Sequence, residues 1–413
     1  MTPANRRGWT IVALLFCATA INYVDRQTLS VLGPTLRLEF NLSEHGYANV
    51  VTAFLIPYTI MYSLGGRLMD RFGARLGLAV SLAWWSIATM LTGFARGALT
   101  LGVFRCLLGV AEPCVFPAGI KACTEWFPSA RRALATGIFS SGSAVGAILA
   151  PPVVAWCTLA VGWRFAFLIP GALGLIWLPC WLVAYRKSGP VDPAARTVAV
   201  PTWRQLLKDR TVWGLVLPRF AADPVWYFYL FWLPDYLQRA RGLSLRDLAV
   251  YGWIPFLFAD LGSLVSGAVS DRLIRHGWTP ARARMAVLIA VGCLSPFGAL
   301  AGRVSSASFA IAITCLVAFL TQCWSTNSTT LASDLLPAPA VGTAAGMMGT
   351  AGSLGGALFA QVLALVIARF GYPAAFAVAA VLHPLAAITT LLLLRRPLLL
   401  KVRTFAGREE LCE

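Results

Sequence analysis

Long apolar segments separated by short polar ones follow one another along the whole chain. A helix needs about 20 mostly apolar residues to cross the hydrocarbon core of a bilayer. Outer-membrane strands are shorter than these segments and alternate in polarity, which these do not. The pattern predicts an all-α membrane protein with twelve transmembrane helices: 9–36, 47–69, 76–95, 98–120, 132–156, 163–185, 211–236, 248–270, 284–302, 306–331, 341–368 and 372–394.

Composition supports this prediction. Hydrophobic residues make up 58% of the chain and charged residues 12%, against about 45–50% and 25% in soluble domains. So little charge excludes a soluble enzyme, a disordered chain and a disulfide-rich secreted module. The ten cysteines lie mostly in apolar segments without metal-ligand spacing, and are interpreted as small buried hydrophobes. The sequence contains no Walker A, HExxH or GxSxG motif, so we expect no enzyme, no metal and no cofactor.

One polar stretch, 186–210, divides the chain into two sets of six segments. It contains three prolines and six basic residues. We therefore expect an N-terminal six-helix bundle over 1–185, a cytoplasmic linker over 186–210, and a C-terminal six-helix bundle with a short cytoplasmic tail over 211–413. The halves repeat weakly, because a Gly-x-x-x-Asp-Arg sequence follows the second and the eighth segment. Two pseudo-symmetric bundles would enclose a central site between them.

Positive charge is distributed unevenly between the two sets of loops. The loops on the side of both termini and the linker carry 22 of the 34 Lys and Arg residues, and the opposite loops carry eight. Cytoplasmic loops are rich in Lys and Arg, so both termini are predicted to be cytoplasmic. The net charge of +17 therefore reflects topology and not a nucleic-acid partner.

Several motifs resemble those of a known family. The stretch Gly66-x-x-x-Asp-Arg-x-Gly73-x-Arg75 resembles the signature loop of the major facilitator superfamily. Asn22-Tyr-Val-Asp-Arg26 and Glu125-Trp-Phe-Pro128 resemble its anion:cation symporter family, and the stretch from Asp223 to Pro234 is similar to hexuronate transporters. The resemblance implies a monomeric transporter of a small organic anion in a bacterial inner membrane, with the lipid bilayer as its surroundings.

Charged residues inside apolar segments are the candidate functional groups. Each is unfavourable at mid-bilayer by at least about 2.5–3.5 kcal/mol on insertion scales. Such residues usually face the bundle interior and serve transport. They are Asp25, Arg26, Arg105, Glu112, Arg219, Asp223 and Asp260.

In the N-terminal half, Arg26 and Arg105 are predicted to bind the anion, since a guanidinium matches a carboxylate with two parallel hydrogen bonds. Tyr23 and Tyr58 add hydroxyl groups. Asp25 and Glu112 are predicted to exchange protons, and the family resemblance implies the same roles. Arg105 and Glu112 are seven residues apart and would share one face of a continuous helix, with Gly109 leaving room for a ligand. The alternative is that these charges form buried ion pairs that fix helix packing.

In the C-terminal half, a polar run in the tenth segment suits a sugar. Amide groups of Gln322 and Asn327 would bind hydroxyls, and the Trp324 ring would cover an apolar sugar face. The alternative is hydrogen bonding between helices. Arg219 and Asp223, four residues apart, are expected to neutralise each other, and Pro224 to interrupt their helix. Asp260 is either a second proton site or a structural hydrogen-bond acceptor.

The repeated Gly-x-x-x-Asp-Arg loops are predicted to form a gate on the cytoplasmic side, or else only to set topology. The gate residues are Asp70, Arg71, Arg75, Asp271 and Arg272. Together these features predict a proton-coupled importer of a hexuronate such as glucuronate or galacturonate. Aldonates, aldarates and aromatic acids remain alternative substrates, anion exchange an alternative mechanism, and a transporter-like ligand sensor an alternative of another class.

Overall fold

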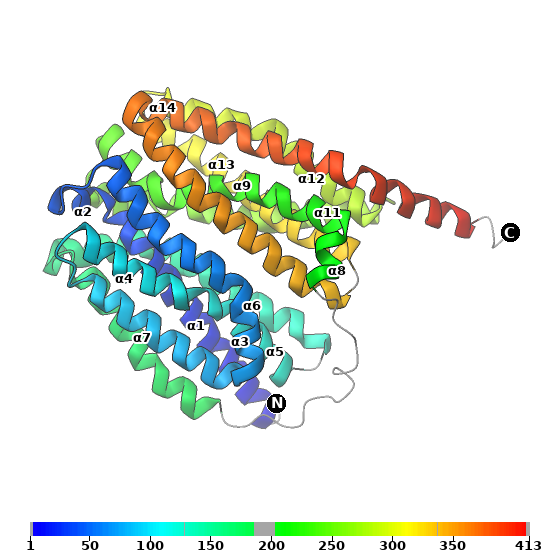
Figure 1. The fold of residues 1–413 in the computed structure, drawn as a ribbon, viewed down its shortest axis with the longest axis horizontal. Coiled ribbons are helices and arrows are strands. Elements are labelled where there is room, and N and C mark those ends of the chain that lie inside the picture. Colours follow the sequence, from blue (N-terminus) through cyan, green and yellow to red (C-terminus); the bar gives the residue numbers. More distant parts are fainter. Residues whose placement is uncertain (1–2, 128, 186–202, 337, 410–413) are drawn as a thin grey trace.

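The computed structural model describes residues 3–127, 129–185, 203–336 and 338–409 and is helical almost throughout (Figure 1). Most of the expected linker, 186–202, and residues 410–413 of the expected tail lie outside the described residues. The helices before the linker are α1 (Pro3–Val31), α2 (Gly33–Glu39), α3 (Glu44–Thr92), α4 (Ala98–Ala111), η1 (Glu112–Cys114), α5 (Val115–Trp126), α6 (Ser129–Val161) and α7 (Phe165–Ala184). Those after it are α8 (Trp203–Lys208), α9 (Arg210–Asp235), η3 (Tyr236–Ala240), α10 (Leu245–Tyr251), α11 (Ile254–Arg275), α12 (Pro280–Leu294), η4 (Ser295–Gly302), α13 (Ala307–Leu335) and α14 (Ala338–Glu409).

Among the described residues, ten helical stretches are long and apolar enough to cross a membrane. One of them, Ala340–Leu394, has 55 residues, or about 80 Å of helix, and turns back at Gly371 to make two crossings. α9 is not among the ten because Arg219, Asp223 and three prolines lower its hydropathy, yet it runs beside α14 along the bundle (Figure 1). The fold is therefore the expected twelve-helix membrane fold.

Two glycines turn the chain between crossings that would otherwise form one helix. Gly73 has φ +78° between the two halves of α3, and Gly371 has φ +75° between the two halves of α14. Residues with a side chain rarely adopt this left-handed backbone conformation. The sharp reversals at the ends of the second and eleventh crossings therefore depend on glycine.

Prolines distort the crossings unevenly. Pro113 lies in a 3₁₀ turn, η1, that ends α4 within the fourth crossing, and Pro296 opens the 3₁₀ segment η4 in the ninth. The expectation that Pro224 interrupts its helix is wrong, because α9 stays helical from Arg210 to Asp235. Prolines are tolerated within membrane helices where neighbouring helices satisfy the freed backbone groups.

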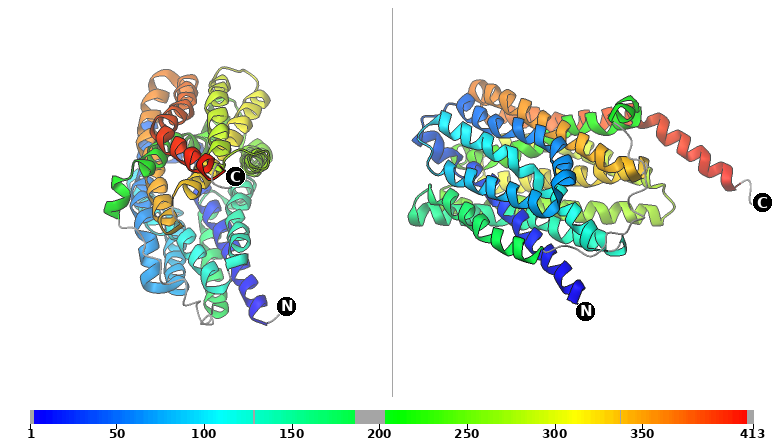
Figure 2. Two further views of the ribbon diagram at one scale, coloured as in Figure 1. Left: turned by 90° about the vertical axis from the view of Figure 1, so that its right-hand side faces the viewer. Right: turned by 60° about the horizontal axis from the view of Figure 1, so that its bottom comes forward.

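The helices form two groups, α1 to α7 and α9 to α14 (Figures 1 and 2). α2 lies at one end of the molecule and both chain ends lie toward the other (Figure 1). We call these ends the α2 side and the terminal side. The groups meet mainly where α3 packs on α14, and α6 also packs on α10 and α11, and α1 on α9. Thr59 of α3 donates to Ser353 of α14 at 2.9 Å in this interface.

The halves repeat a close helix contact. A Cβ on Gly146 of α6 would lie 2.3 Å from the Ala20 carbonyl oxygen of α1. A Cβ on Gly355 of α14 would lie 2.2 Å from the Phe220 carbonyl oxygen of α9. Only glycine allows either backbone approach. The two contacts are equivalent in the two halves, so α1 corresponds to α9 and Ala20 to Phe220.

Candidate functional site

The predicted charges of the N-terminal half converge at the centre of their bundle. Asp25 and Arg26 come from α1, Arg105 from α4 and Glu112 from η1, and at most 4% of any of them is exposed. They place two basic and two acidic side chains in the interior of the protein. Charges so placed need partners or a ligand, because desolvation is expensive.

Arg26 and Glu112 form the one close ion pair of this cluster. Arg26 Nε and Nη2 both donate to Glu112 Oε2, at 2.9 and 2.8 Å. Nη2 also approaches Asn22 Oδ1 and the Tyr58 hydroxyl at 3.3 Å. The guanidinium lies 4.9 Å from the centre of the Tyr23 ring and 4.8 Å from that of Tyr58. These contacts hold the fork of Arg26 in place.

A 3₁₀ turn within the fourth crossing begins at the pairing residue Glu112. α4 ends at Ala111, and Glu112 begins the 3₁₀ turn that contains Pro113. Glu112 keeps helical backbone angles, and Arg105 is one of its electrostatic neighbours, so these two side chains stay close, as their seven-residue spacing predicts. Glu112 also contacts Arg26 of α1. The expectation that Gly109 leaves room for a ligand is wrong, since a Cβ there would lie 2.2 Å from the Phe54 carbonyl oxygen of α3.

Arg105 has no hydrogen-bond partner for any of its three guanidinium nitrogens among the described residues. It is fully buried and lies over the Phe54 ring, 4.7 Å from the ring centre. An aromatic face compensates only part of the desolvation of a guanidinium. Arg105 thus offers an unused fork of donors inside the molecule, suited to a carboxylate.

Asp25 is equally unsatisfied. Neither carboxylate oxygen has a hydrogen-bond partner among the described residues, and the side chain is fully buried. Glu112 and Arg105 are its charged neighbours, and the Thr89 hydroxyl lies beside it without meeting hydrogen-bond geometry. A buried carboxyl group between an anion and a cation is well placed to take up and release a proton.

The predicted sugar-binding residues of the C-terminal half have different surroundings. Asn327 is buried and bonded, accepting from Ser270 Oγ of α11 at 2.5 Å and donating to the Cys323 carbonyl at 3.0 Å. Trp324 packs edge-on against His383 of α14, with ring centres 5.6 Å apart. Gln322 is half-buried, with no hydrogen bond to another described residue. Gln322 and the Trp324 indole nitrogen thus have no hydrogen bond to another described residue, whereas Asn327 does.

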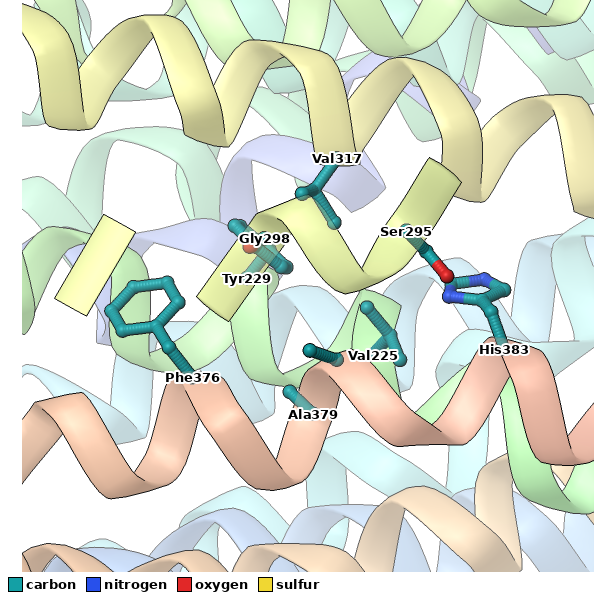
Figure 3. A pocket seen from close by; sticks show the side chains of 9 residues that line it. Val225, Tyr229, Ser295, Gly298, Val317, Phe376, Ala379 and His383 are labelled. Atoms are coloured by element: carbon teal, nitrogen blue, oxygen red, sulfur yellow. The ribbon is translucent and has the colours of Figure 1, made fainter. Parts of the chain in front are cut away.

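His383 borders a small pocket inside the C-terminal half, lined by α9, η4, α13 and α14. In Figure 3 the Ser295 hydroxyl points toward the His383 ring. Both side chains are buried, and their polar atoms have no hydrogen-bond partner among the described residues. The other lining residues, such as Val225 and Phe376, are mostly apolar. The pocket lies apart from the central charges and suits helix packing.

Arg219 and Asp223 pair as expected, at 3.0 Å. Arg219 Nη1 also donates to Ser325 Oγ of α13 at 3.0 Å. Asp260 is half-buried on α11 and has no hydrogen bond or ion pair to another described residue. The pair and Asp260 are thus separate from the Arg26–Glu112 pair.

The predicted gate residues contact only their own half. Arg75 donates to the Leu182 carbonyl at 2.9 Å, and Asp271 pairs with Arg284 at 3.1 Å. Arg71 and Arg272 are exposed. The side chain of Asp70 lies outside the described residues. No described contact of these residues bridges the two halves on the terminal side.

An ion network on the α2 side, absent from our sequence-based expectations, bridges the halves instead. Glu44 binds Arg37 at 2.6 Å and Arg239 at 2.8 Å. Asp235 binds Arg239 at 3.1 Å and lies 3.7 Å from Arg37, and Tyr372 donates to Asp235. Arg37 and Glu44 belong to the N-terminal half and the other three to the C-terminal half. The halves are therefore closed against each other on the α2 side.

Comparisons with known proteins agree with this architecture. The Major Facilitator Superfamily model matches residues 15–360. The hexuronate transporter of Escherichia coli K12 is 31% identical over 398 residues, 92% of each chain. The galacturonate transporter of Dickeya chrysanthemi is 35% identical over 279 residues, 63% of this chain and 80% of that one. A bacterial homologue of the human lysosomal transporter Spinster, solved in an inward-facing, unoccupied conformation, matches with TM-score 0.75 and 18% identity over 96% of both chains.

The solved structure supports the fold, and the family model and the hexuronate transporter match most of the chain. The predicted resemblance to hexuronate transporters is thereby confirmed. Multiple membrane-spanning helices and these relatives identify a multi-pass membrane protein. The chain belongs to the major facilitator superfamily, whose members are membrane transporters and not enzymes.

Proposed function

We propose that this protein is a proton-coupled symporter that imports a hexuronate, such as glucuronate or galacturonate, by alternating access. Arg105 carries the proposal, because a buried guanidinium with three unpartnered nitrogens calls for an anionic ligand. Relatives named for hexuronate, galacturonate, galactonate and galactarate or glucarate transport support a sugar acid. All of these substrates carry a carboxylate and several hydroxyl groups.

The substrate carboxylate binds the fork of Arg105 in this proposal. Tyr23 and Tyr58, beside Arg26, offer hydroxyls to the sugar. The half-buried Gln322 supplies an amide from the C-terminal half, whereas the amide of Asn327 is used between α11 and α13. Trp324 then serves C-terminal packing.

Proton binding and substrate binding are coupled in this proposal because both change the net charge of the buried site. Arg26 is neutralised by Glu112 and can take part in anion binding only when Glu112 releases it. A proton on Glu112 removes its charge and frees the guanidinium. Asp25, next to Arg105, acts in the same way when protonated. Substrate and protons thus enter the same buried site together, which avoids an uncompensated charge in a low-dielectric interior.

The orientation follows from loop charge. The terminal side is cytoplasmic, the α2 side faces the periplasm, and the protein lies in a bacterial inner membrane as a monomer. The bundles of 1–185 and 211–413 rock about the central charges, joined by the 186–210 linker. With the α2-side network closed, the structure corresponds to an inward-facing state.

The test is uptake of radiolabelled glucuronate into proteoliposomes, competed by unlabelled galacturonate, galactonate, glucarate and benzoate. The proposal expects saturable uptake that galacturonate inhibits most strongly and benzoate least. Uptake inhibited more strongly by galactonate or glucarate would assign an aldonate or aldarate instead. The absence of uptake of every sugar acid would contradict the proposal.

A further inference from the structure

A second arginine–carboxylate pair faces the interior from the other half of the molecule. Arg219 Nη2 lies 3.0 Å from Asp223 Oδ2, and their side chains are 14% and 16% exposed. The Arg26–Glu112 side chains, in contrast, are 5% and 0% exposed. The C-terminal pair is therefore less deeply buried than the N-terminal one.

Arg219 keeps donors beyond its ion pair. Its Nη1 donates to Ser325 Oγ at 3.0 Å and to Ser328 Oγ at 3.2 Å, both on α13. Its Nε has no partner among the described residues. A guanidinium beside two hydroxyl groups is the donor set that a sugar acid requires, one group for the carboxylate and the others for hydroxyls.

Glycines of α14 make room for the side chains around this pair. A Cβ on Gly352 would lie 1.9 Å from Asp223 Oδ2, and one on Gly349 would lie 2.3 Å from the Tyr62 ring. Tyr62 of α3 lies in electrostatic contact with both Arg219 and Arg26. The pair therefore adjoins the central site through a tyrosine at the interface of the two halves.

The pair lies closer to the terminal side than the central charges. The equivalent contacts of Gly146 and Gly355 put Ala20 and Phe220 at corresponding depths in the two halves. Arg26 therefore corresponds to position 226. Arg219 precedes that position by seven residues, which is about 10 Å along a helix. An anion that moves from Arg26 toward the terminal side therefore meets Arg219 next.

We propose that Arg219, with the hydroxyls of Ser325 and Ser328, forms a second sugar-acid subsite between the central charges and the terminal side. The inference rests on the proposed function. Asp223 occupies Arg219 while the subsite is empty, and the substrate carboxylate displaces it on its way through. The competing interpretation is an ion pair that only fixes α9.

The test compares the two sides of the membrane. Exchange of labelled glucuronate is measured in proteoliposomes with oriented protein, and KM is determined separately for the terminal side and the α2 side. Arg219→Gln is expected to raise KM on the terminal side at least about tenfold, since a charge-assisted contact is lost. KM on the α2 side and equilibrium binding at the central site are expected to change less than about threefold. Arg164→Gln, in an exposed pair with Glu39, is the matched control.

The double variant Arg219→Gln, Asp223→Asn separates the two interpretations, because it keeps the site electroneutral. The subsite predicts that the raised terminal-side KM persists in the double variant. A terminal-side KM restored to the wild-type value would overturn the subsite and leave a structural pair. If Arg219→Gln fails to fold, the same assay is run with the double variant and with Ser325→Ala, Ser328→Ala, and the subsite predicts a raised terminal-side KM for both. Wild-type protein that transports no sugar acid contradicts the proposed function, whereas transport with unchanged variants contradicts only the subsite.

Discussion

At the scale of single residues, the site is defined by which charges have partners. Arg26 is satisfied by Glu112, Asn22 and Tyr58. Arg105 and Asp25 are buried to the same degree and have no hydrogen-bond partner among the described residues. An unpaired buried charge is strongly unfavourable, so these two side chains are where ligand and proton change the energy most.

Arg105→Gln removes the free guanidinium and keeps a similar size. We expect hexuronate affinity to fall at least about 30-fold, because a charge-assisted contact is worth about 2–3 kcal/mol. Isothermal titration with purified protein measures the dissociation constant. Arg303→Gln, in the loop region after η4, is the control and should bind as wild type. Normal hexuronate binding by Arg105→Gln would refute the assignment of the anion site.

Glu112→Gln permanently removes one of the two carboxylate charges of the cluster. Arg26 then has no ionised partner at 2.8 Å and is free to hold the anion without a proton. We expect accumulation driven by a proton gradient to fall at least about tenfold, while counterflow of labelled against unlabelled substrate continues. Full gradient-driven accumulation by Glu112→Gln would remove Glu112 from the coupling mechanism.

At the scale of helices, the apolar segments predicted all twelve crossings within several residues, but not their internal breaks. Apolar length reports burial in lipid, whereas the 3₁₀ turn at Glu112 depends on Pro113 and on the pairing of Glu112 with α1. The Arg26–Glu112 contact joins residues 86 positions apart, so helix periodicity within one segment could not predict it. Pro224 looked like a break and is not one, since packing around α9 outweighs its local preference.

The α2-side network was missed for a related reason. Arg37 and Arg239 were counted as loop charges, and Asp235 lies at the end of a segment. The available signal was that acidic residues are scarce, 17 in the whole chain, yet Glu44 and Asp235 both lie near segment ends, within seven residues of Arg37 and four residues of Arg239 respectively.

Gly146→Ala tests the close contact between α6 and α1. The added Cβ would lie 2.3 Å from the Ala20 carbonyl oxygen, so the helices must separate, which costs about 1–3 kcal/mol. We expect a lower thermal unfolding midpoint in detergent and slower transport. Gly137→Ala, in the same helix with nothing within 4 Å of the added Cβ, should unfold like wild type. Equal midpoints for both variants would show that the contact is not tight.

At the scale of the whole molecule, the two halves are held together on the α2 side by four charges and Tyr372. Each half supplies residues to this network, and Asp235 is fully buried within it. On the terminal side, none of the predicted gate residues that the structure describes forms an ion pair with the other half. Opening toward the α2 side therefore requires these ion pairs to break, together with hydrogen bonds across the same interface such as the one from Tyr47 to the Phe231 carbonyl.

Glu44→Gln weakens two of these pairs at once. We expect a larger population open on the α2 side, measured as a longer distance between spin labels at Leu38 and Val250 in a variant without native cysteines. Both positions are exposed, one on α2 and the other on α10. Glu39→Gln, whose partner Arg164 belongs to the same half, should leave the distances unchanged. An identical distance distribution for Glu44→Gln and wild type would rule out a closing role for Glu44.

The central claim, proton-coupled import of a hexuronate, is tested most directly by uptake of radiolabelled glucuronate into proteoliposomes with and without an imposed inward proton gradient. The account predicts accumulation above the external concentration only when the gradient is present, and its collapse when a protonophore is added. Uptake that is independent of the proton gradient and requires an anion inside the proteoliposomes would contradict symport and identify an exchanger.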